Sequence, residues 1–545
     1  MADLALASSG VHNIAGLLEQ RAAERPDQRA VVFPSARDPS GRVAWTQLTF
    51  AQLDTLTDEI ARGLLARGAR RGDRVSVLVR PCLEFIPIVF ALFKMGAIPV
   101  MIDPGMGRAQ FLACLRRMAP RVLVAESAVH ALRPLAWRSF RSVEIAVSMG
   151  RGWWGAIPLS KLRAPGERFP AVAVGADDEA AILFTSGSTG PAKGVTYTHG
   201  IFATQTRLIG ETMGIEPGEI DLACFPLFGL FSMALGMTVV IPDMDPTKPA
   251  QVDPARIVEA IDTHGCTSAS GSPAIWKRVG PYCADNGIRL PSLLRVLTFG
   301  APIPLSIHET FRSVLRDGAE VHTPYGATEC LPVASIATRE VLGEAAARTR
   351  DGAGTCVGRP VRDANVRIVP ITDEPLDEAR ALPPGEVGEI TVAGPMVTPE
   401  YKNDPVATRA AKIATPEGLR HRMGDVGYLD ADGRLWFCGR KSHRVTLADG
   451  RVLFPVQVEG VLNDVPGVAR TALVGVDGEP VICVEITGGA LWSVVEAMLR
   501  ARAAEHPLTR AIGSFLAHPG FPVDVRHNAK IDRLRLGSWA AEQKR

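Results

Sequence analysis

The chain has 545 residues, 60 Lys and Arg against 58 Asp and Glu, a formal net charge of +2, and 46% hydrophobic residues. Roughly 100–200 residues make one domain, so this length predicts about three to five domains or subdomains. The ordinary apolar and charged fractions exclude wholesale disorder. A near-neutral total charge also gives no support to a nucleic-acid binder that works by general phosphate neutralisation. We therefore expect a large, soluble, globular protein.

The cysteines and the apolar stretches of the chain indicate where in the cell the protein is expected. The nine cysteines are scattered without a CxxC pair, and their odd number argues against a disulfide framework, so a reducing cytoplasm fits best. The N-terminus has no basic region and too short an apolar core for a signal peptide. The most apolar stretch, 85–102, contains Lys94 and has Pro87 and Pro99 near its ends. These residues favour a buried helix and strand over a transmembrane segment.

Helices and strands are predicted to alternate along the first part of the chain. Apolar residues recur at helical spacing over 50–67, with Thr49 as the N-cap, and the turn after this helix leads into a strand at 74–79. A helix at 84–94 and a strand at 98–102 follow. Further strands are expected at 121–124, 180–184, 239–241 and 295–298. This alternation predicts an α/β fold with layers of helices and largely parallel sheets.

The later part of the chain has a different pattern. Short strands separated by Asp, Pro and Gly turns over 366–392 predict a small β subdomain. A basic polar run at 439–444 is the clearest boundary. We therefore expect a large N-terminal domain of α/β subdomains over 1–438, a hinge at 439–444 and a small, mobile α+β lid domain over 445–545. The elements expected in the lid domain are helices at 456–463 and 491–504 and strands at 468–476 and 481–486.

The most informative segment is the loop that follows the predicted strand at 180–184. It reads Thr185-Ser186-Gly187-Ser188-Thr189-Gly190-Pro191-Ala192-Lys193-Gly194. Glycines let backbone N–H groups approach a polyanion, hydroxyls donate further hydrogen bonds, and a lysine adds a mobile cation. The pattern GxxxxGK[ST] is absent, so this is not a Walker A loop. An ordinary Ser/Gly-rich turn is the alternative, but the complete string with its lysine favours phosphate binding.

This loop resembles the signature of the adenylate-forming superfamily, which comprises acyl-CoA synthetases, peptide-synthetase adenylation domains and luciferases. That signature normally has a proline directly before the lysine, whereas here Ala192 precedes Lys193 and the proline is Pro191. Other segments resemble family elements in the family's order and extend the resemblance over about residues 48–533. They are LTFAQL at 48–53, FKMGAIPV at 93–100, FGAP at 299–302, YGATE at 325–329, GEI with a later glycine at 388–394, GD at 424–425 and GR at 439–440.

The resemblance implies an ATP-using enzyme with Mg²⁺, in which Lys530, Thr328 and Lys193 are catalytic. The β- and γ-phosphates would be held by Lys193 and by Thr185, Ser186, Gly187, Ser188, Thr189 and Gly190. The remaining implied roles are adenine contact for Gly300, Ala301, Pro302 and Tyr325, donation to the α-phosphate for Thr328, Mg²⁺ ligation for Glu329, and ribose binding for Asp425 with Arg440 beside it. Taken alone, Tyr325 fits a core aromatic equally well, Glu329 a surface carboxylate, and Asp425 a turn residue.

Lys530 is the candidate catalytic lysine of the C-terminal part. The segment 521–533, FPVDVRHNAKIDR, keeps the family's K-x-x-R spacing through Lys530 and Arg533, although His-Asn-Ala at 527–529 replaces the usual Ser-Gly. The resemblance implies that Lys530 bridges the substrate carboxylate and the α-phosphate. A solvated lysine in a basic tail is the alternative. His527 fits either a base or a turn residue, and we favour the turn.

Two departures from the family pattern concern the acceptor and the acyl pocket. Ser442 stands where the family usually has Asp or Lys, and the loop 442–451 is slightly longer than usual. In thioester-forming members this region helps to build the pantetheine tunnel, so the departure weakens the case for coenzyme A. In FPLFGLFS at 225–232, Gly229 stands where a histidine is common. Its phenylalanines favour a lipophilic substrate, although a plain core explains them equally well.

The combined pattern predicts a ligase that adenylates a carboxylic acid. This step needs no general base, because the carboxylate is already ionised at neutral pH. The segments PLFGLFSMALG, SASGSP and RHNAKI look most like those of the bacterial β-lactone synthetases of olefin biosynthesis. Those enzymes adenylate a 2-alkyl-3-hydroxy fatty acid, and its 3-hydroxyl then displaces AMP. A long-chain acyl-CoA or acyl-carrier synthetase is the runner-up, and a non-catalytic acyl-nucleotide-binding protein is the third alternative.

The expected partners follow from this interpretation. The substrate is a lipophilic 3-hydroxy carboxylic acid, and neither a nucleic-acid partner nor a transmembrane segment is expected. An assembly with other enzymes of the same pathway is compatible with this interpretation.

Overall fold

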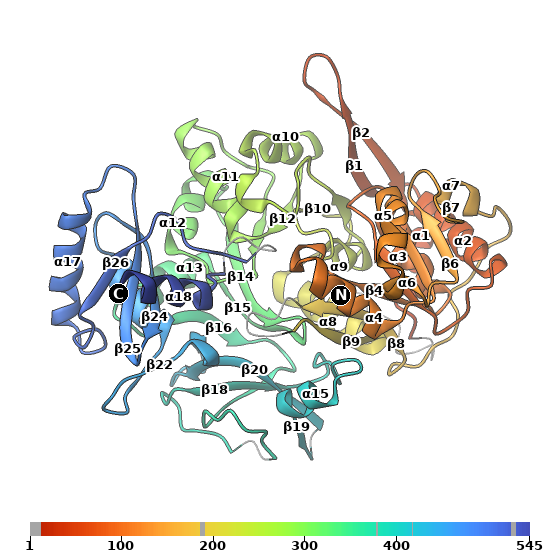
Figure 1. The fold of residues 1–545 in the computed structure, drawn as a ribbon. Coiled ribbons are helices and arrows are strands. Elements are labelled where there is room, and N and C mark those ends of the chain that lie inside the picture. Colours follow the sequence, from red (N-terminus) through yellow and green to blue (C-terminus); the bar gives the residue numbers. More distant parts are fainter. Residues whose placement is uncertain (1–11, 186–190, 378–379, 417, 525–529, 545) are drawn as a thin grey trace.

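The computed structural model describes residues 12–185, 191–377, 380–416, 418–524 and 530–544 of the chain. Figure 1 shows a large N-terminal region and, at one side of it, a smaller region formed by the C-terminal elements. Within the described ranges the strands form a fourteen-stranded sheet, a seven-stranded sheet, a three-stranded sheet and a two-stranded ribbon. The expected α/β class, with a large N-terminal domain and a smaller C-terminal one, is confirmed.

The seven-stranded sheet is built by the first part of the chain. In spatial order its strands are β7 (Ile157–Pro158), β6 (Ile145–Ser148), β5 (Val122–Ala125), β3 (Arg74–Leu78), β4 (Ile98–Met101), β8 (Glu179–Thr185) and β9 (Lys193–Thr198). The strands from β7 to β8 are parallel, and β9 pairs antiparallel with β8 as a hairpin. The predicted phosphate loop is the connection of this hairpin.

Helices α2 (Phe50–Ala66) and α3 (Phe85–Lys94) explain how the most apolar stretch of the chain is buried. Thr49 caps α2 as predicted, by accepting a hydrogen bond from the backbone of the first turn. Every residue of α3 is buried, including Lys94. The ammonium of Lys94 is compensated by ion pairs with Asp54, Asp58 and Glu19. Among the described residues, no helix has the length and apolar character needed to cross a membrane.

The fourteen-stranded sheet has a parallel half and an antiparallel half. In spatial order its strands are β17 (Asn365–Val369), β18 (Gly388–Ala393), β20 (Gly418–Leu429), β21 (Leu435–Arg440), β16 (Thr355–Pro360), β15 (Cys330–Ala337), β14 (Glu320–Ala327), β13 (Arg295–Thr298), β12 (Ser268–Gly271), β10 (Ile220–Ala223), β11 (Thr238–Val240), β1 (Arg29–Arg37) and β2 (Val43–Thr49), with β19 (Lys412–Thr415) beside β20. Pairing is parallel from β14 to β1 and antiparallel from β14 to β17. The short strands predicted over 366–392 belong to this antiparallel half.

Further helices connect the strands of the large region. They are α1 (Ala15–Glu24), α4 (Arg108–Met118), α5 (Ser127–Leu132), α6 (Trp137–Phe140), α7 (Leu159–Leu162), α8 (His199–Met213), α9 (Gly229–Ala234), α10 (Pro254–His264), α11 (Pro273–Asp285), α12 (Leu305–Val314), α13 (Thr338–Glu340), α14 (Ala346–Arg350) and α15 (Pro405–Ala411). A short 3₁₀-helix, η3 (Arg133–Ala136), links α5 to α6.

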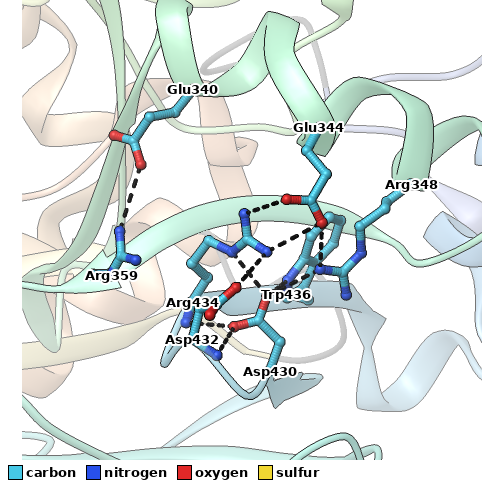
Figure 2. Close-up of polar contacts among 8 residues, drawn as sticks. All are labelled: Glu340, Glu344, Arg348, Arg359, Asp430, Asp432, Arg434 and Trp436. Atoms are coloured by element: carbon cyan, nitrogen blue, oxygen red, sulfur yellow. Dashed lines mark hydrogen bonds and ion pairs between the residues drawn. The ribbon is translucent and has the colours of Figure 1, made fainter.

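A charged network holds the turn between β20 and β21 (Figure 2). Asp430 accepts a 2.9 Å hydrogen bond from Trp436 Nε1 and pairs with Arg434 and Arg348. Arg434 also pairs with Glu344, and the Arg348 guanidinium lies 4.2 Å from the centre of the Trp436 ring. Burial opposes ionisation of Asp430, but hydrogen bonds from Trp436 and Arg434 outweigh it and lower the pKa of this carboxyl to about 2. The network braces one end of the hairpin that carries two predicted site residues.

The C-terminal region has a hydrophobic core of its own, which includes residues from Val445 to Phe515. Its elements are β22 (Val445–Thr446), β23 (Val452–Leu453), α16 (Pro455–Leu462), β24 (Val468–Val476), β25 (Glu479–Ile486), α17 (Trp492–Glu505), β26 (Ser514–Ala517) and α18 (Arg533–Gln543). Polar contacts join it to the segment around α14, where Arg350 Nε lies 3.3 Å from Asp464 Oδ1.

Candidate functional site

The β8–β9 hairpin positions the two described ends of the predicted phosphate loop. Thr185 ends β8, Lys193 begins β9, and the two residues pair in register. The predicted phosphate-binding residues that lie outside the described residues are Ser186, Gly187, Ser188, Thr189 and Gly190. Lys193 Nζ lies 4.8 Å from the centre of the Tyr401 ring. The hairpin therefore directs this cation toward the segment that contains Tyr401.

Thr328 and Glu329 form the turn between β14 and β15, and two buried tyrosines hold it. Tyr197 OH donates to Thr328 O at 2.7 Å, and Tyr401 OH donates to Glu329 Oε1 at 2.8 Å. Burial and the adjacent Glu329 carboxylate both raise the pKa of Tyr401, so its hydroxyl keeps its proton. Lys193, Tyr401 and Glu329 thus form one chain of contacts, and the carboxylate of Glu329 has a defined orientation.

A buried lysine behind Glu329 has no counterpart in the sequence prediction. Lys412 in β19 is 5% exposed, and its Nζ donates to Thr398 Oγ1 at 3.3 Å. Thr398 N in turn donates to Glu329 O at 2.9 Å. Burial lowers the pKa of Lys412 to about 8, and the Glu329 carboxylate opposes that shift. The residues around Lys412 in the sequence do not distinguish it from a surface lysine. Its burial depends on strands that pack against it from elsewhere in the chain.

Asp425 and Arg440 lie opposite each other in the β20–β21 hairpin. Arg440 Nη1 is 3.1 Å from Asp425 Oδ1, and Tyr325 OH donates to Asp425 Oδ2 at 2.6 Å. Asp425 is 6% exposed, yet its Oδ1 receives no hydrogen bond of good geometry from any described residue. A buried acceptor without a donor costs roughly 1–3 kcal/mol, so this oxygen is suited to a hydroxyl of a ligand.

Lys530 reaches this corner from the C-terminal region. Its backbone is tied on both sides, because Lys530 N donates to Asp524 Oδ1 and Asp524 N donates to Lys530 O, each at 2.9 Å. Burial raises the pKa of Asp425, while Arg440, the Tyr325 hydrogen bond and the charge of Lys530 all oppose that rise. The ammonium of Lys530 therefore lies within electrostatic reach of the Asp425 carboxylate. His527 lies outside the described residues.

The predicted adenine segment follows β13 at the carboxyl end of the parallel half of the sheet. Ligands of such sheets commonly bind at this end of the strands. Gly300 has a φ of +97°, a conformation that favours glycine. Ala301 is half-buried and Pro302 is exposed. Within the described chain, hydrogen bonds and ion pairs join neither Gly300, Ala301 nor Pro302 to the Asp425 corner, so their role stays a prediction.

A row of phenylalanines leads from this segment into the core. The ring of Phe299 lies 4.9 Å from that of Phe228, and Phe228 lies 5.7 Å from Phe231. Phe231 stacks on Phe202 with 4.7 Å between the ring centres. The row connects the half-buried Phe228 and Phe299 to the deep core. It offers an apolar surface that begins beside the predicted adenine segment.

The described site residues form two groups that contain charged side chains. One group contains Lys193, Tyr401, Glu329 and Lys412, and a second contains Tyr325, Asp425, Arg440 and Lys530. No group of three or more His, Cys, Asp and Glu residues within the described part of the chain is arranged to hold a metal ion. A single carboxylate such as Glu329 still matches Mg²⁺ bound mainly through phosphate oxygens.

Known proteins resemble this chain in both sequence and fold. Residues 18–402 match the family model of AMP-binding enzymes. The "Olefin beta-lactone synthetase" of Stenotrophomonas maltophilia is 47% identical over 548 residues, which cover 97% of this chain and 98% of that protein. The protein of the same name from Xanthomonas campestris is 46% identical over 550 residues, which cover 98% of each chain.

The structure of ATP-bound MatB from Rhodopseudomonas palustris has a similar fold, with a TM-score of 0.79 at 20% identity. The match covers 98% of this chain and 100% of MatB. At this identity the similarity concerns the fold alone. It agrees with the combination of a large sheet region and a smaller C-terminal region.

Proposed function

Because this chain belongs to the family of AMP-binding enzymes, we propose that it is a β-lactone synthetase that adenylates a 2-alkyl-3-hydroxy fatty acid with ATP and then closes the lactone. Family membership makes the chain an adenylate-forming ligase. The observation that carries the finer proposal is the 47% identity to an olefin beta-lactone synthetase over 97% of the chain.

In the first step, a carboxylate oxygen of the fatty acid attacks the α-phosphorus of ATP. The bond between the α-phosphorus and the oxygen that bridges it to the β-phosphorus breaks, and pyrophosphate leaves. The nucleophile is already ionised, so the protein acts by positioning and by stabilising charge. Lys530 would bind both the carboxylate and the α-phosphate, and Thr328 would donate to the α-phosphate. Lys193 and the loop that begins at Thr185 would hold the β- and γ-phosphates.

The nucleoside would be held by the Asp425 corner. The Oδ1 atom of Asp425, which receives no hydrogen bond of good geometry from the described residues, would accept from the ribose hydroxyls, and its ion pair with Arg440 would stabilise its charge. Tyr325, with its hydroxyl held by Asp425, would place its ring against adenine beside the segment 300–302. The assignment of Asp425 rests on a buried oxygen that a ligand hydroxyl would favourably satisfy.

Glu329 is suited to hold Mg²⁺. Tyr401 fixes one of its carboxylate oxygens, and one carboxylate together with phosphate oxygens is a donor set that Mg²⁺ accepts. When bound, the ion would neutralise charge on the phosphates. Lys193 and Lys412 supply further positive charge on either side of Glu329.

In the second step, the 3-hydroxyl oxygen attacks the acyl carbon, the bond from that carbon to AMP breaks, and the hydroxyl proton leaves with AMP. Nucleophile and electrophile belong to the same molecule, so the reaction benefits from a high effective concentration, although the strain of a four-membered ring lowers it. The protein then needs only to fold the substrate and exclude water. The row of phenylalanines from Phe299 to Phe202 is the candidate wall for its alkyl chains.

Two further assignments accompany this proposal. Residues 439–444 are the proposed hinge between a large domain over 1–438 and a lid domain over 445–545 that carries Lys530. A cytoplasmic location is supported by the nine cysteines, all of which are described and are free thiols.

The group that accepts the acyl moiety distinguishes a β-lactone synthetase from the alternative, a long-chain acyl-CoA synthetase. Enzyme, ATP, Mg²⁺ and a 2-alkyl-3-hydroxy acid, without coenzyme A, should give AMP and a product lighter by one water, as measured by mass spectrometry. The same acid without the 3-hydroxyl is the matched control, and it should stall as a bound acyl-adenylate or hydrolyse slowly. Release of AMP that strictly requires coenzyme A, with a thioester as the product, would instead establish an acyl-CoA synthetase.

A further inference from the structure

Helices α5 and α6 lie in the part of the large region that is away from the C-terminal elements in Figure 1, and they carry part of an exposed apolar and basic surface. The surface is formed by α5, η3 and α6 together with the loop 149–156. Its exposed apolar residues include Leu135, Trp137 and Trp154, which are 73%, 62% and 62% exposed. We call this surface the arginine–tryptophan patch, and its members are Leu132, Arg133, Leu135, Trp137, Arg138, Arg141, Arg151, Trp153 and Trp154.

The two segments of the patch form one continuous surface. Ser127 Oγ donates to Arg151 O at 2.9 Å, and Trp154 Nε1 donates to Ala131 O at 3.3 Å. Arg133 Nη2 also donates to Trp154 O at 2.8 Å. Trp154 has a φ of +53°, which is unfavourable for a bulky side chain. The backbone therefore accepts strain at the point where this indole is presented to solvent.

The charge of the patch has a single sign. The nine residues of the patch include four arginines and no Asp or Glu, a charge of +4. The whole chain carries +2, so the other residues together carry −2. Within the described chain, no ion pair involves a patch arginine. Two guanidinium groups instead lie over indole rings, that of Arg138 at 5.8 Å from Trp137 and that of Arg151 at 4.8 Å from Trp153.

From this arrangement we infer that the arginine–tryptophan patch docks the enzyme on an anionic lipid bilayer. Indoles are favoured at the boundary between acyl chains and headgroups, because they are apolar with one polar N–H. Arginine buries its stem in apolar surroundings and keeps its head among phosphates. Charge complementarity selects the partner, because a uniformly positive, apolar surface matches a sheet of lipid phosphates. If the proposed function holds, docking would place the enzyme where a long-chain acid partitions.

Sedimentation of the full chain with vesicles tests this inference. We expect binding to phosphatidylcholine vesicles that contain phosphatidylglycerol, a loss of binding as salt rises, and little binding to phosphatidylcholine alone. Replacing three patch arginines (Arg138→Gln, Arg141→Gln, Arg151→Gln) should weaken partitioning about 100-fold. Replacing two indoles (Trp137→Ser, Trp154→Ser) should weaken it at least about tenfold through lost apolar contact.

Matched variants elsewhere on the surface test whether binding depends on this site or on general charge and hydrophobicity. Arg339, Arg359 and Arg362 are well exposed, as are Val406 and Leu491. Changing these arginines to Gln, or these two apolar residues to Ser, should leave vesicle binding unchanged.

Three results would overturn the inference. The first is an absence of binding to anionic vesicles at low salt, and the second is binding by the patch variants that equals that of the unmodified chain. The third is a dimer in size-exclusion chromatography that only the patch variants abolish. The last result would assign the patch to a second copy of the chain. Pyrophosphate release from soluble substrate should be the same in all variants. A failure of docking is therefore distinguishable from a failure of the proposed function.

Discussion

The Asp425 corner and Lys530 contribute to the same predicted site but are positioned in different ways. Asp425 and Arg440 lie in paired strands of the large sheet, with Tyr325 contributed by a third strand. Lys530 belongs to the C-terminal region, and hydrogen bonds with Asp524 hold its backbone. The register of paired strands sets the positions of Asp425 and Arg440, whereas the placement of the whole C-terminal region sets the position of Lys530. We infer that the corner serves binding and that Lys530 serves the chemical step.

The largest expected effect is that of Lys530→Ala. Loss of one preorganised donor to the transition state should slow pyrophosphate release by roughly 10²–10³. The Kd for ATP should barely change, because the Asp425 corner stays intact. Lys544→Ala is the matched control, since Lys544 lies in the same region and pairs with Glu479 at the surface. Near-normal pyrophosphate release by Lys530→Ala would show that the catalytic lysine is elsewhere.

The next effect is on nucleotide binding, through Asp425→Asn. A neutral amide would leave Arg440 without its counter-charge and weaken the acceptor for ribose. The Kd for ATP, measured by calorimetry, should rise about 10–100-fold. Tyr325→Phe removes only the 2.6 Å hydrogen bond to Asp425 and should weaken binding less. If Asp425→Asn lowers the rate of the chemical step but leaves the Kd unchanged, the division between binding and chemistry is wrong.

Asp430 tests whether the charged network stabilises the hairpin that carries Asp425 and Arg440, because it is buried at the far end of that hairpin. Its pKa is about 2 in the folded protein against an ordinary 3.8, so the unfolded chain binds more protons between these values. Stability should therefore fall as the pH falls through this window. Asp430→Asn should cost about 2 kcal/mol of unfolding free energy at pH 7 and lose this acid dependence.

Denaturation at pH 7 and at pH 3 measures both effects. Asp432→Asn is the control in the same turn, because Asp432 pairs with Arg434 while 64% exposed and should change stability little. Wild-type stability of Asp430→Asn at pH 7 would mean that the network does not brace the hairpin.

The smallest expected effect concerns the proposed hinge at 439–444, which joins the large N-terminal region to the C-terminal region. Ser442→Pro fixes φ near −65° in the proposed hinge and should slow turnover about tenfold if that residue changes conformation in each cycle. Ser442→Ala, which keeps the backbone free, should be near wild type. Circular dichroism would confirm that the variant is folded. Unchanged turnover in the folded proline variant would remove Ser442 as the pivot.

Much of the local structure was predictable. The strand predicted at 295–298 is β13 and that predicted at 468–476 is β24, with the same limits. The strand predicted at 481–486 begins earlier, at Glu479, because Glu479 pairs with Val476 across a tight hairpin. Hydrophobic periodicity reports burial of a residue, whereas the end of a hairpin strand depends on its partner. Strand order was beyond prediction for the same reason.

The candidate site divides in a similar way. The motifs indicated Glu329 and Asp425, but they carried no information on Tyr401 or Lys412. These two residues contact Glu329 or lie behind it from positions more than 70 residues away along the chain. The arginine–tryptophan patch was equally invisible, because exposed tryptophans cannot be told from core tryptophans in a sequence. Exposure is a property of the packed chain.

The sequence by itself determined which chemical groups the chain carries, the order in which they occur, and the elements that hold them, because these depend on residue identity and on local backbone preferences. Tertiary structure alone decided which groups meet. It buried Asp425 with one oxygen that receives no well-formed hydrogen bond from the described residues, set Lys412 behind Glu329 and left Trp137 and Trp154 in solvent. These outcomes depend on contacts between residues far apart in the chain, whose energies no local pattern contains.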